Sequence, residues 1–383
     1  METRSIPQIQ VNLPGSFWGI TSFYNPAAYG NKLKNYRIFR ANNKRQGLKL
    51  ITVELAFGDK SFDLNKDDAD ILVQLRGSEK NIIWQKEALL NIALKHLPAD
   101  CDKVVWLDCD ITFKNENWIK ETSVLLEKYT MVQPFSKAVR LLKGAQDLTE
   151  DEIDALPYGR YEGQRMFGFC YLFSTSTSKI GHEGFAWAIR KDIIIKHSFY
   201  DRLFAGSSDT AMISLFSDSS LFKDLRWTIF NSRMLSHYLH WGDNIKKDIR
   251  MSMWYTNGSL LHLWHGDIQE RLFLFRYKIL NTYNFDPDKD VRISSNGLLE
   301  WASDKPDLHQ AVKEYFQFRD EEGKSILIPL IVDELYNTNQ ELAELRYSKA
   351  YKITHVISKI FNSLFFLPSL KKAGLWLFDR MTT

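Results

Sequence analysis

The first 110 residues alternate apolar runs with amphipathic stretches, and this alternation constrains the fold more than any other feature of the sequence. Strands are predicted at 17–23, 48–57, 71–75 and 104–107, and helices at about 31–46 and 84–97. Such an order predicts an α/β fold, with a parallel sheet covered by helices on both faces. Ligands of these folds bind at the carboxyl ends of the strands. Since the run Val104–Leu107 leads directly into Asp108, we expect a ligand site there.

The length and charge of the chain limit how it can be organised. With 383 residues, 44% of them hydrophobic, it can bury a sizeable core, and we predict a first domain over 1–270 and a mostly helical, charged extension over 271–383. The formal net charge of +3 does not favour a nucleic-acid partner. Cys101, Cys109 and Cys170 lack CxxC spacing, so we expect a reducing compartment rather than disulfides or a zinc knuckle.

Two features bear on location. The polar N-terminus lacks the apolar core of a signal peptide, and no apolar run approaches the length of a membrane span, so a cytoplasmic protein is expected. Residues 349–380 interleave apolar side chains with lysines. This segment either lies on the inner face of an anionic membrane as a peripheral contact or packs as a terminal helix, and Pro368 favours packing.

The segment Asp108-Cys109-Asp110 places two carboxylates one residue apart at a strand end. Oxygen ligands of this kind suit Mg²⁺ and Mn²⁺, which protein carboxylates commonly bind together with phosphates. Such a metal neutralises a departing diphosphate. The alternative is two surface acids in a loop, because so short a motif often arises by chance.

A second candidate is His262-Leu263-Trp264-His265-Gly266, which follows an apolar, strand-like run. Two histidines three residues apart can point at one ion, and one imidazole can complete an oxygen-rich site. The alternative is a pair of core histidines. His265 is the better candidate because it stands at the strand end beside Gly266.

A third candidate is Gly206-Ser207-Ser208-Asp209, a small-residue loop that ends in a carboxylate where a helix is expected to start. Asp209 suits a general base that deprotonates an acceptor hydroxyl. It equally suits a helix N-cap, and one residue can do both.

A fourth candidate is the segment 181–190, in which small residues alternate with aromatic ones. Here the backbone at Gly184 can approach a sugar and Trp187 can offer a stacking face. The alternative is a buried strand with a glycine bend.

In this order the four segments resemble the GT-A fold glycosyltransferases, in particular the group of β-1,4-galactosyltransferases and bacterial family-2-like enzymes. The resemblance covers about residues 15–320. It implies a GT-A, Rossmann-like catalytic domain with a C-terminal, mostly helical extension. It also implies sugar transfer from a nucleotide-diphosphate sugar, of the UDP-sugar type, to a hydroxyl of a glycan or lipid-linked glycan, with Mn²⁺ or Mg²⁺ as cofactor.

The resemblance also implies residue roles. Asp110 would be the direct metal ligand, with Asp108 near the ribose or the metal, and Asp209 would be the base of an inverting reaction. The metal set is Asp108, Asp110, His262 and His265. Donor contacts would include Lys86, Asn91, Gly184 and Trp187. The sequence departs from the family where the acid before Asp209 is replaced by serine, which affects the expected acceptor contacts.

Further candidate residues for the nucleotide pocket follow only from their positions in the sequence. Thr21, Tyr24 and Glu54 stand at predicted strand ends, and Arg40 and Arg76 are candidates for phosphate or base contacts.

Two other functions fit parts of the sequence. Residues 107–112 also match the DxDxT motif of haloacid-dehalogenase-type phosphatases, with Asp108 as the nucleophile and Asp243 and Asp248 imitating a later acidic motif. Against it, about a hundred residues precede the motif and the histidines have no role. The other alternative is a carbohydrate-binding protein without activity, which the intact acids and histidines disfavour.

Overall fold

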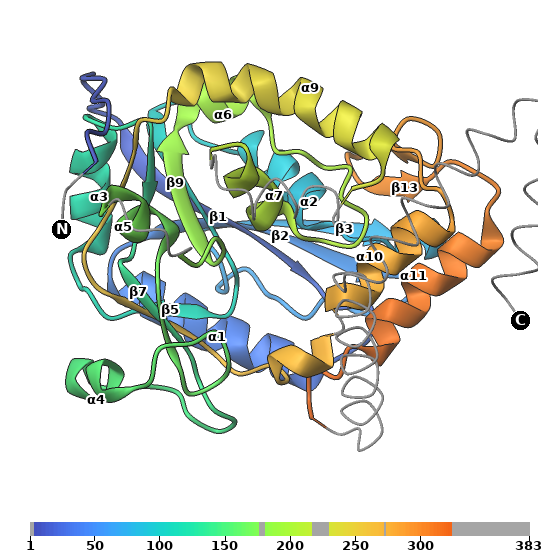
Figure 1. The fold of residues 1–383 in the computed structure, drawn as a ribbon. Coiled ribbons are helices and arrows are strands. Elements are labelled where there is room, and N and C mark those ends of the chain that lie inside the picture. Colours follow the sequence, from blue (N-terminus) through green and yellow to red (C-terminus); the bar gives the residue numbers. More distant parts are fainter. Residues whose placement is uncertain (1–3, 176–180, 217–229, 272, 324–383) are drawn as a thin grey trace, which may run out of the picture. The chain divides into compact units, whose positions relative to one another are not determined.

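The computed structural model describes residues 4–175, 181–216, 230–271 and 273–323 (Figure 1). Residues Met1–Lys324 make up one compact unit. The segment 349–380, for which the sequence predicts a membrane or packing role, lies outside the described residues. Within the described part of the chain, no helix has both the length and the apolar character that a bilayer crossing requires.

A seven-stranded sheet forms the centre of this unit, in the order β10-β6-β9-β4-β1-β2-β3. The strands are β1 (Ser16–Tyr24), β2 (Lys49–Phe57), β3 (Ile71–Gly77), β4 (Cys101–Leu107), β6 (Met131–Gln133), β9 (Ala186–Arg190) and β10 (Met253–Tyr255). β9 runs antiparallel to both of its neighbours, and the other pairs are parallel. The predicted α/β fold with a mostly parallel, Rossmann-like sheet is confirmed.

Helices cover both faces of this sheet, which explains the continuous apolar runs of its strands. Along β4, Val104 and Trp106 pack in a core with α2 (Lys86–Leu94), α6 (Lys191–His197) and α9 (Ser232–Ile249). Val105 and Leu107 point the other way, into a core with α1 (Gly30–Arg45) and α3 (Trp118–Leu126). Figure 1 shows α6 and α9 on one side of the sheet and α1 on the other. The predicted helices at 31–46 and 84–97 correspond to α1 and α2.

A smaller sheet follows the end of β4, in the order β5-β11-β7-β8. Its strands are β5 (Ile111–Phe113), β7 (Lys137–Arg140), β8 (Arg165–Phe167) and β11 (Ser259–His262). β11 pairs antiparallel with β5 and parallel with β7, which sets His262 opposite both Ile111 and Arg140. This pairing brings residues 140 and 262 beside the acids that follow β4.

The described segment 273–323 packs on the same core. It forms α10 (Phe273–Thr282), the hairpin of β12 (Val291–Ile293) and β13 (Leu299–Trp301), and α11 (Pro306–Phe318). Leu280, Leu299 and Val312 belong to the hydrophobic core that also holds α2. The predicted division at residue 270 therefore does not coincide with a break in the core of the described residues.

Candidate active site

A cavity of about 470 Å³ opens at the carboxyl ends of β1 and β4. Its walls come from the end of β1 and the start of α1, from residues 107–110, and from residues 182–185. The 3-10 helix η2 (Ile268–Arg271), the helix α7 (Ser208–Ser214) and residues 316–321 close it. It lies where ligands of parallel α/β sheets bind.

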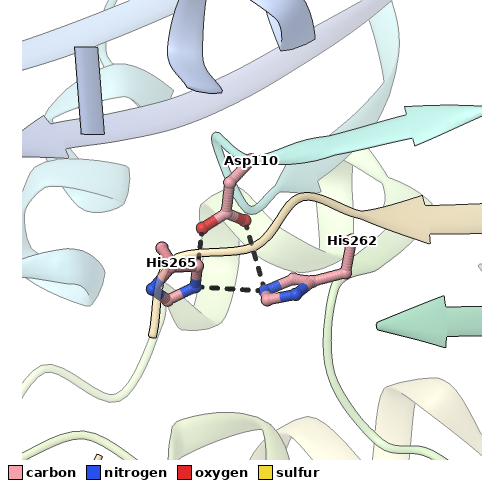
Figure 2. A group of neighbouring side chains, drawn as sticks. All are labelled: Asp110, His262 and His265. Atoms are coloured by element: carbon pink, nitrogen blue, oxygen red, sulfur yellow. Dashed lines mark hydrogen bonds and ion pairs between the residues drawn. The ribbon is translucent and has the colours of Figure 1, made fainter. Parts of the chain in front are cut away.

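Asp110, His262 and His265 converge in this cavity (Figure 2). His265 Nε2 lies 3.1 Å from Asp110 Oδ2, and His262 Nε2 lies 3.7 Å from Asp110 Oδ1. The two Nε2 atoms are 3.2 Å apart. The backbone supports this arrangement, because the Leu263 N–H donates to the Asp110 carbonyl at 2.8 Å.

The chemistry of this group fits a divalent metal ion. One ligand atom from each of the three residues lies within 4.8 Å of the others. Burial lowers the pKa of both imidazoles well below the usual value, so each is neutral and offers a lone pair. Asp110 Oδ1 is buried without a hydrogen-bond partner. A carboxylate oxygen and two imidazole nitrogens make a set that first-row divalent metals accept.

Asp108, the fourth predicted ligand, lies outside this group and pairs with a lysine instead. Lys86 Nζ lies 2.6 Å from Asp108 Oδ1 and 3.3 Å from Asp209 Oδ2. Burial raises the pKa of Asp108 to about 6, against the opposing charge of Lys86. Three of the predicted donor and catalytic residues, Lys86, Asp108 and Asp209, thus meet in one cluster.

Asp209 is held at the edge of the cavity by the start of α7. Ser207 occupies the N-cap position of this helix, with a positive φ of 81°, and Asp209 lies in the first helical turn. The N-cap alternative for Asp209 is therefore not found. Its carboxylate faces Lys86 across the cavity wall.

Of the remaining predicted residues, Tyr24 and Gly184 line the cavity, whereas six do not. Three of these six are held within the sheet. The Thr21 hydroxyl donates to the Leu107 carbonyl at 2.7 Å, joining β1 to β4. Glu54 accepts hydrogen bonds from the backbone of the loop after β2 and from a side chain of β3. Trp187 is fully buried, and its Nε1 donates to the Glu183 carbonyl.

The other three are occupied in contacts that stabilise the periphery of the unit. Arg40 pairs with Asp70 at 2.9 Å. Arg76 Nη1 donates to two carbonyls of the loop after β2, at 2.6 and 2.7 Å. Asn91 donates to the Phe199 carbonyl at 3.0 Å. These three side chains therefore contact other segments of the chain and do not line the cavity.

The cavity also contains charged residues that are not among the predicted site residues. Arg319 and Glu321 follow α11 and pair at 2.9 Å, and Glu321 Oε2 lies 3.7 Å from His265 Nδ1. Arg140 and Arg271 are buried in the same cavity. The segment 315–321 belongs to the family resemblance without a predicted site role, whereas nothing local in the sequence distinguishes Arg140 and Arg271, because only the tertiary fold brings them to the cavity.

The phosphatase alternative loses its later acidic motif. Asp243 and Asp248 lie on α9, and neither lines the cavity. Asp248 instead pairs with Lys196 and His197, at 2.7 and 2.6 Å. The structure therefore does not bring the two acidic motifs of that alternative together.

Comparison with known proteins finds a likeness of fold only. No model of a known protein family matches the chain, and no curated protein matches it. Among solved structures, it is similar to 4-diphosphocytidyl-2C-methyl-D-erythritol synthase from Anaerococcus prevotii, with 15% identity over 64% of this chain and 89% of that one, at a TM-score of 0.29. It is also similar to residues 1–349 of S. aureus TarS, with 13% identity over 61% and 72% of the two chains, at a TM-score of 0.28.

A third similar structure is glucosyl-3-phosphoglycerate synthase from Mycobacterium tuberculosis, in complex with Mn²⁺, UDP and phosphoglyceric acid. The identity is 10% over 65% of this chain and 71% of that one, at a TM-score of 0.31. At this level of similarity, an assignment of function rests on the site of the present chain.

Proposed function

We propose that this protein is a metal-dependent glycosyltransferase, which moves a sugar from a nucleotide-diphosphate sugar, of the UDP-sugar type, to a hydroxyl of a glycan or glycolipid. One observation carries the proposal: Asp110, His262 and His265 form a group suited to a divalent cation, in the same cavity as Asp108, Lys86 and Asp209. A diphosphate donor needs such a cation, and a sugar acceptor needs a nearby base.

In this proposal Asp110, His262 and His265 would hold Mn²⁺ or Mg²⁺, and the bound ion would supply positive charge to the leaving diphosphate. The imidazoles favour Mn²⁺ over Mg²⁺, since Mg²⁺ prefers oxygen ligands. Asp108 is held by Lys86 at the end of β4, where it can accept a hydrogen bond from a ribose hydroxyl. Tyr24 and Gly184 line the space left for the nucleotide and the sugar.

Asp209 is the proposed base. Its carboxylate lies in the cavity and takes the proton of the acceptor hydroxyl as that oxygen attacks the anomeric carbon. A single displacement of this kind inverts the anomeric configuration. The neighbouring Lys86 Nζ, 3.3 Å from Asp209 Oδ2, holds this carboxylate at the cavity wall.

The test is a screen of nucleotide sugars for hydrolysis or transfer with Mn²⁺, beginning with UDP-sugars. Turnover should require the metal, and Asp110→Asn should abolish it while the protein stays folded. Product stereochemistry by NMR tests the base: inversion is expected, and a retained configuration would exclude a single displacement. Unchanged turnover in Asp110→Asn at saturating Mn²⁺ would remove the metal group from the reaction.

A further inference from the structure

A second buried polar cluster lies in the cavity and has no part in the function proposed above. Arg140, at the end of β7, and His182 are each only 7% exposed, and both line the cavity. Arg140 Nη2 lies 3.0 Å from His182 Nε2, and Arg140 Nε donates to the Arg160 carbonyl at 3.1 Å. The cluster therefore presents nitrogen atoms to the cavity.

The two ring nitrogens of His182 both lie next to hydrogen-bond donors. The Gly184 N–H donates to His182 Nδ1 at 3.0 Å, and a guanidinium has donors but no acceptor. An imidazole always carries at least one N–H. Both nitrogens of His182 lie beside a donor, so one of them must place its own N–H against the N–H of its neighbour, where no hydrogen bond can form. With Nδ1 accepting from Gly184, the His182 proton is on Nε2, toward Arg140. An acceptor oxygen beside both N–H groups would satisfy them.

The charge of this region points to the same kind of ligand. Within the described part of the chain, the contacts of Arg140 are the Arg160 carbonyl, His182 and the Phe185 ring, without an ion pair to a carboxylate. Arg271 is also buried, donates to the Gly266 carbonyl at 3.2 Å, and has an Nε without a hydrogen-bond partner. Glu162 acts on both guanidinium groups through its charge, but neither guanidinium forms a direct ion pair among the described residues. A buried cation without a carboxylate in contact is unfavourable, so an anion in contact with these donors is favoured here.

This cluster is adjacent to the metal group and is separated from it by one aromatic ring. The Phe185 ring stacks on His182, with a centroid distance of 4.0 Å, and its distance to the His262 ring is 4.8 Å. A divalent metal at Asp110 and the histidines would bring the donor diphosphate into the same cavity, so the competition with UDP described below distinguishes that diphosphate from a separate anionic group.

The proposed base is close to the same cluster. A Cβ added at Gly184 would lie 3.1 Å from His182 Cε1 and 3.4 Å from Asp209 Oδ2. Only a residue without a side chain therefore stands between His182 and Asp209. One sugar can reach both, with an anionic substituent toward Arg140 and the reacting centre toward Asp209.

We propose that Arg140 and His182, together with Arg271, form a subsite for a carboxylate or phosphate group carried by a sugar substrate, separate from the diphosphate of the donor. The identity of the ligand as a sugar rests on the function proposed above, whereas the anion site rests on the donors themselves. The anionic group belongs either to the acceptor or to the sugar that is transferred, and the two sources give different results in the experiment below.

The experiment measures binding by calorimetry and thermal denaturation of the full chain. The free sugars are tested first with a metal chelator and then with saturating UDP and Mn²⁺, whereas the UDP-sugars are tested with Mn²⁺ and without added UDP. Glucose-6-phosphate and glucuronate are compared with glucose, and UDP-glucuronate is compared with UDP-glucose. An acceptor subsite predicts that glucose-6-phosphate or glucuronate binds in the presence of UDP and Mn²⁺ and that glucose does not. A donor subsite predicts that UDP-glucuronate binds at least about tenfold more tightly than UDP-glucose.

Two variants test the residues, with a matched control. Arg140→Lys and His182→Gln should each weaken binding of the anionic ligand about tenfold or more, because each removes a hydrogen bond to a charged group. Arg190→Lys is the control, since Arg190 is equally buried, donates only to carbonyls, and does not line the cavity. It should bind the anionic ligand as the natural protein does.

Three outcomes would overturn the subsite. These are equal binding of charged and neutral sugars in both arms, unchanged binding in Arg140→Lys, and competition of UDP with the anionic sugar for one position. The proposed function fails differently. If UDP and Mn²⁺ do not bind but the anionic sugar does, and this binding needs Arg140, the anion subsite stands and the glycosyltransferase proposal falls.

Discussion

Lys86 Nζ lies 2.6 Å from Asp108 Oδ1, so a partly buried ion pair joins the first residue of α2 to the acid that follows β4. The same ammonium group lies 3.3 Å from Asp209 Oδ2. Burial alone would lower the pKa of Lys86, but the charges of Asp108 and Asp209 outweigh it and hold that pKa well above its usual value. One lysine thus keeps two carboxylates together in the cavity wall.

Replacing Lys86 should destabilise the fold as well as the site. In Lys86→Met, Asp108 and Asp209 remain close together without a cation, and the loss of one partner of this partly buried pair should cost about 2 kcal/mol, between the values for exposed and fully buried pairs. Urea denaturation measures the change in unfolding free energy. The control is Lys196→Met, because Lys196 is 64% exposed and its pair with Asp248 should contribute less than about 1 kcal/mol. Equal effects of the two substitutions would contradict a buried role for Lys86.

The metal group should be visible without any turnover. Mn²⁺ should raise the melting temperature of the natural protein, since a ligand that binds the folded state stabilises it by mass action. Asp110→Asn and His265→Gln should each remove most of this rise, and a chelator should reverse it. Asp147→Asn is the control, because Asp147 is 69% exposed and pairs with Lys114. A rise that survives in Asp110→Asn would place the ion elsewhere.

The buried carboxyl group of Glu87 should make the stability of the protein depend on pH. Burial raises the pKa of Glu87 to about 7, partly opposed by the charge of Lys86. The carboxyl group therefore holds its proton more tightly in the folded chain than in the unfolded one, so stability should fall as pH rises from about 4.5 to about 7. The total loss from this group is on the order of 3 kcal/mol.

The Glu87→Gln variant separates this effect from other titrating groups. It should flatten the dependence of unfolding free energy on pH over that window, because the amide carries no proton equilibrium there. Glu79→Gln serves as the comparison, since Glu79 is 87% exposed. If the two variants show the same pH profile, the buried carboxyl of Glu87 does not titrate as stated.

Gly184, which lines the cavity, and Gly206, which precedes the cavity residue Ser207, should respond differently to alanine. Gly184→Ala places a methyl group between His182 and Asp209, at ordinary or slightly tight distances, and should reduce substrate turnover with a near-normal melting temperature. Gly206→Ala should instead destabilise by about 1 kcal/mol or more, because Gly206 has a φ of +89° and its Cβ would lie 3.0 Å from Trp84. Thermal denaturation and turnover measured on both variants distinguish these expectations, and a stable, fully active Gly184→Ala would show that no substrate occupies that gap.

The local sequence pattern predicts the strands and the acidic residues that follow them. The apolar run 104–107 predicts a strand buried on both faces, and Asp108 and Asp110 lie at its end as expected. The same pattern does not predict the direction in which a side chain points. Thr21 lies on a strand that reaches the cavity, yet its hydroxyl turns to the neighbouring β4.

The sequence predicts least well the site residues that come from distant segments of the chain. Trp187 was expected as a stacking face, but β9 lies between β4 and β6, so its side chains are covered by helices on both faces. Arg140 lies beside the histidines only because β7 pairs with β11, about 120 residues later in the chain. Strand pairing over such separations depends on the whole fold and leaves no periodic signal around Arg140 itself.

The segment after α11 closes the cavity against the start of α1. The Tyr29 hydroxyl donates to the Arg319 carbonyl, and Asn31 Nδ2 donates to the Glu321 carbonyl at 3.1 Å. The last wall of the cavity is therefore made by residues near 320, although most of its chemistry is encoded by residue 265. During synthesis on a ribosome, the nascent chain cannot complete its binding cavity until this segment has emerged and docked on α1. Ligand binding should thus report the completion of folding, rather than the formation of the parallel sheet.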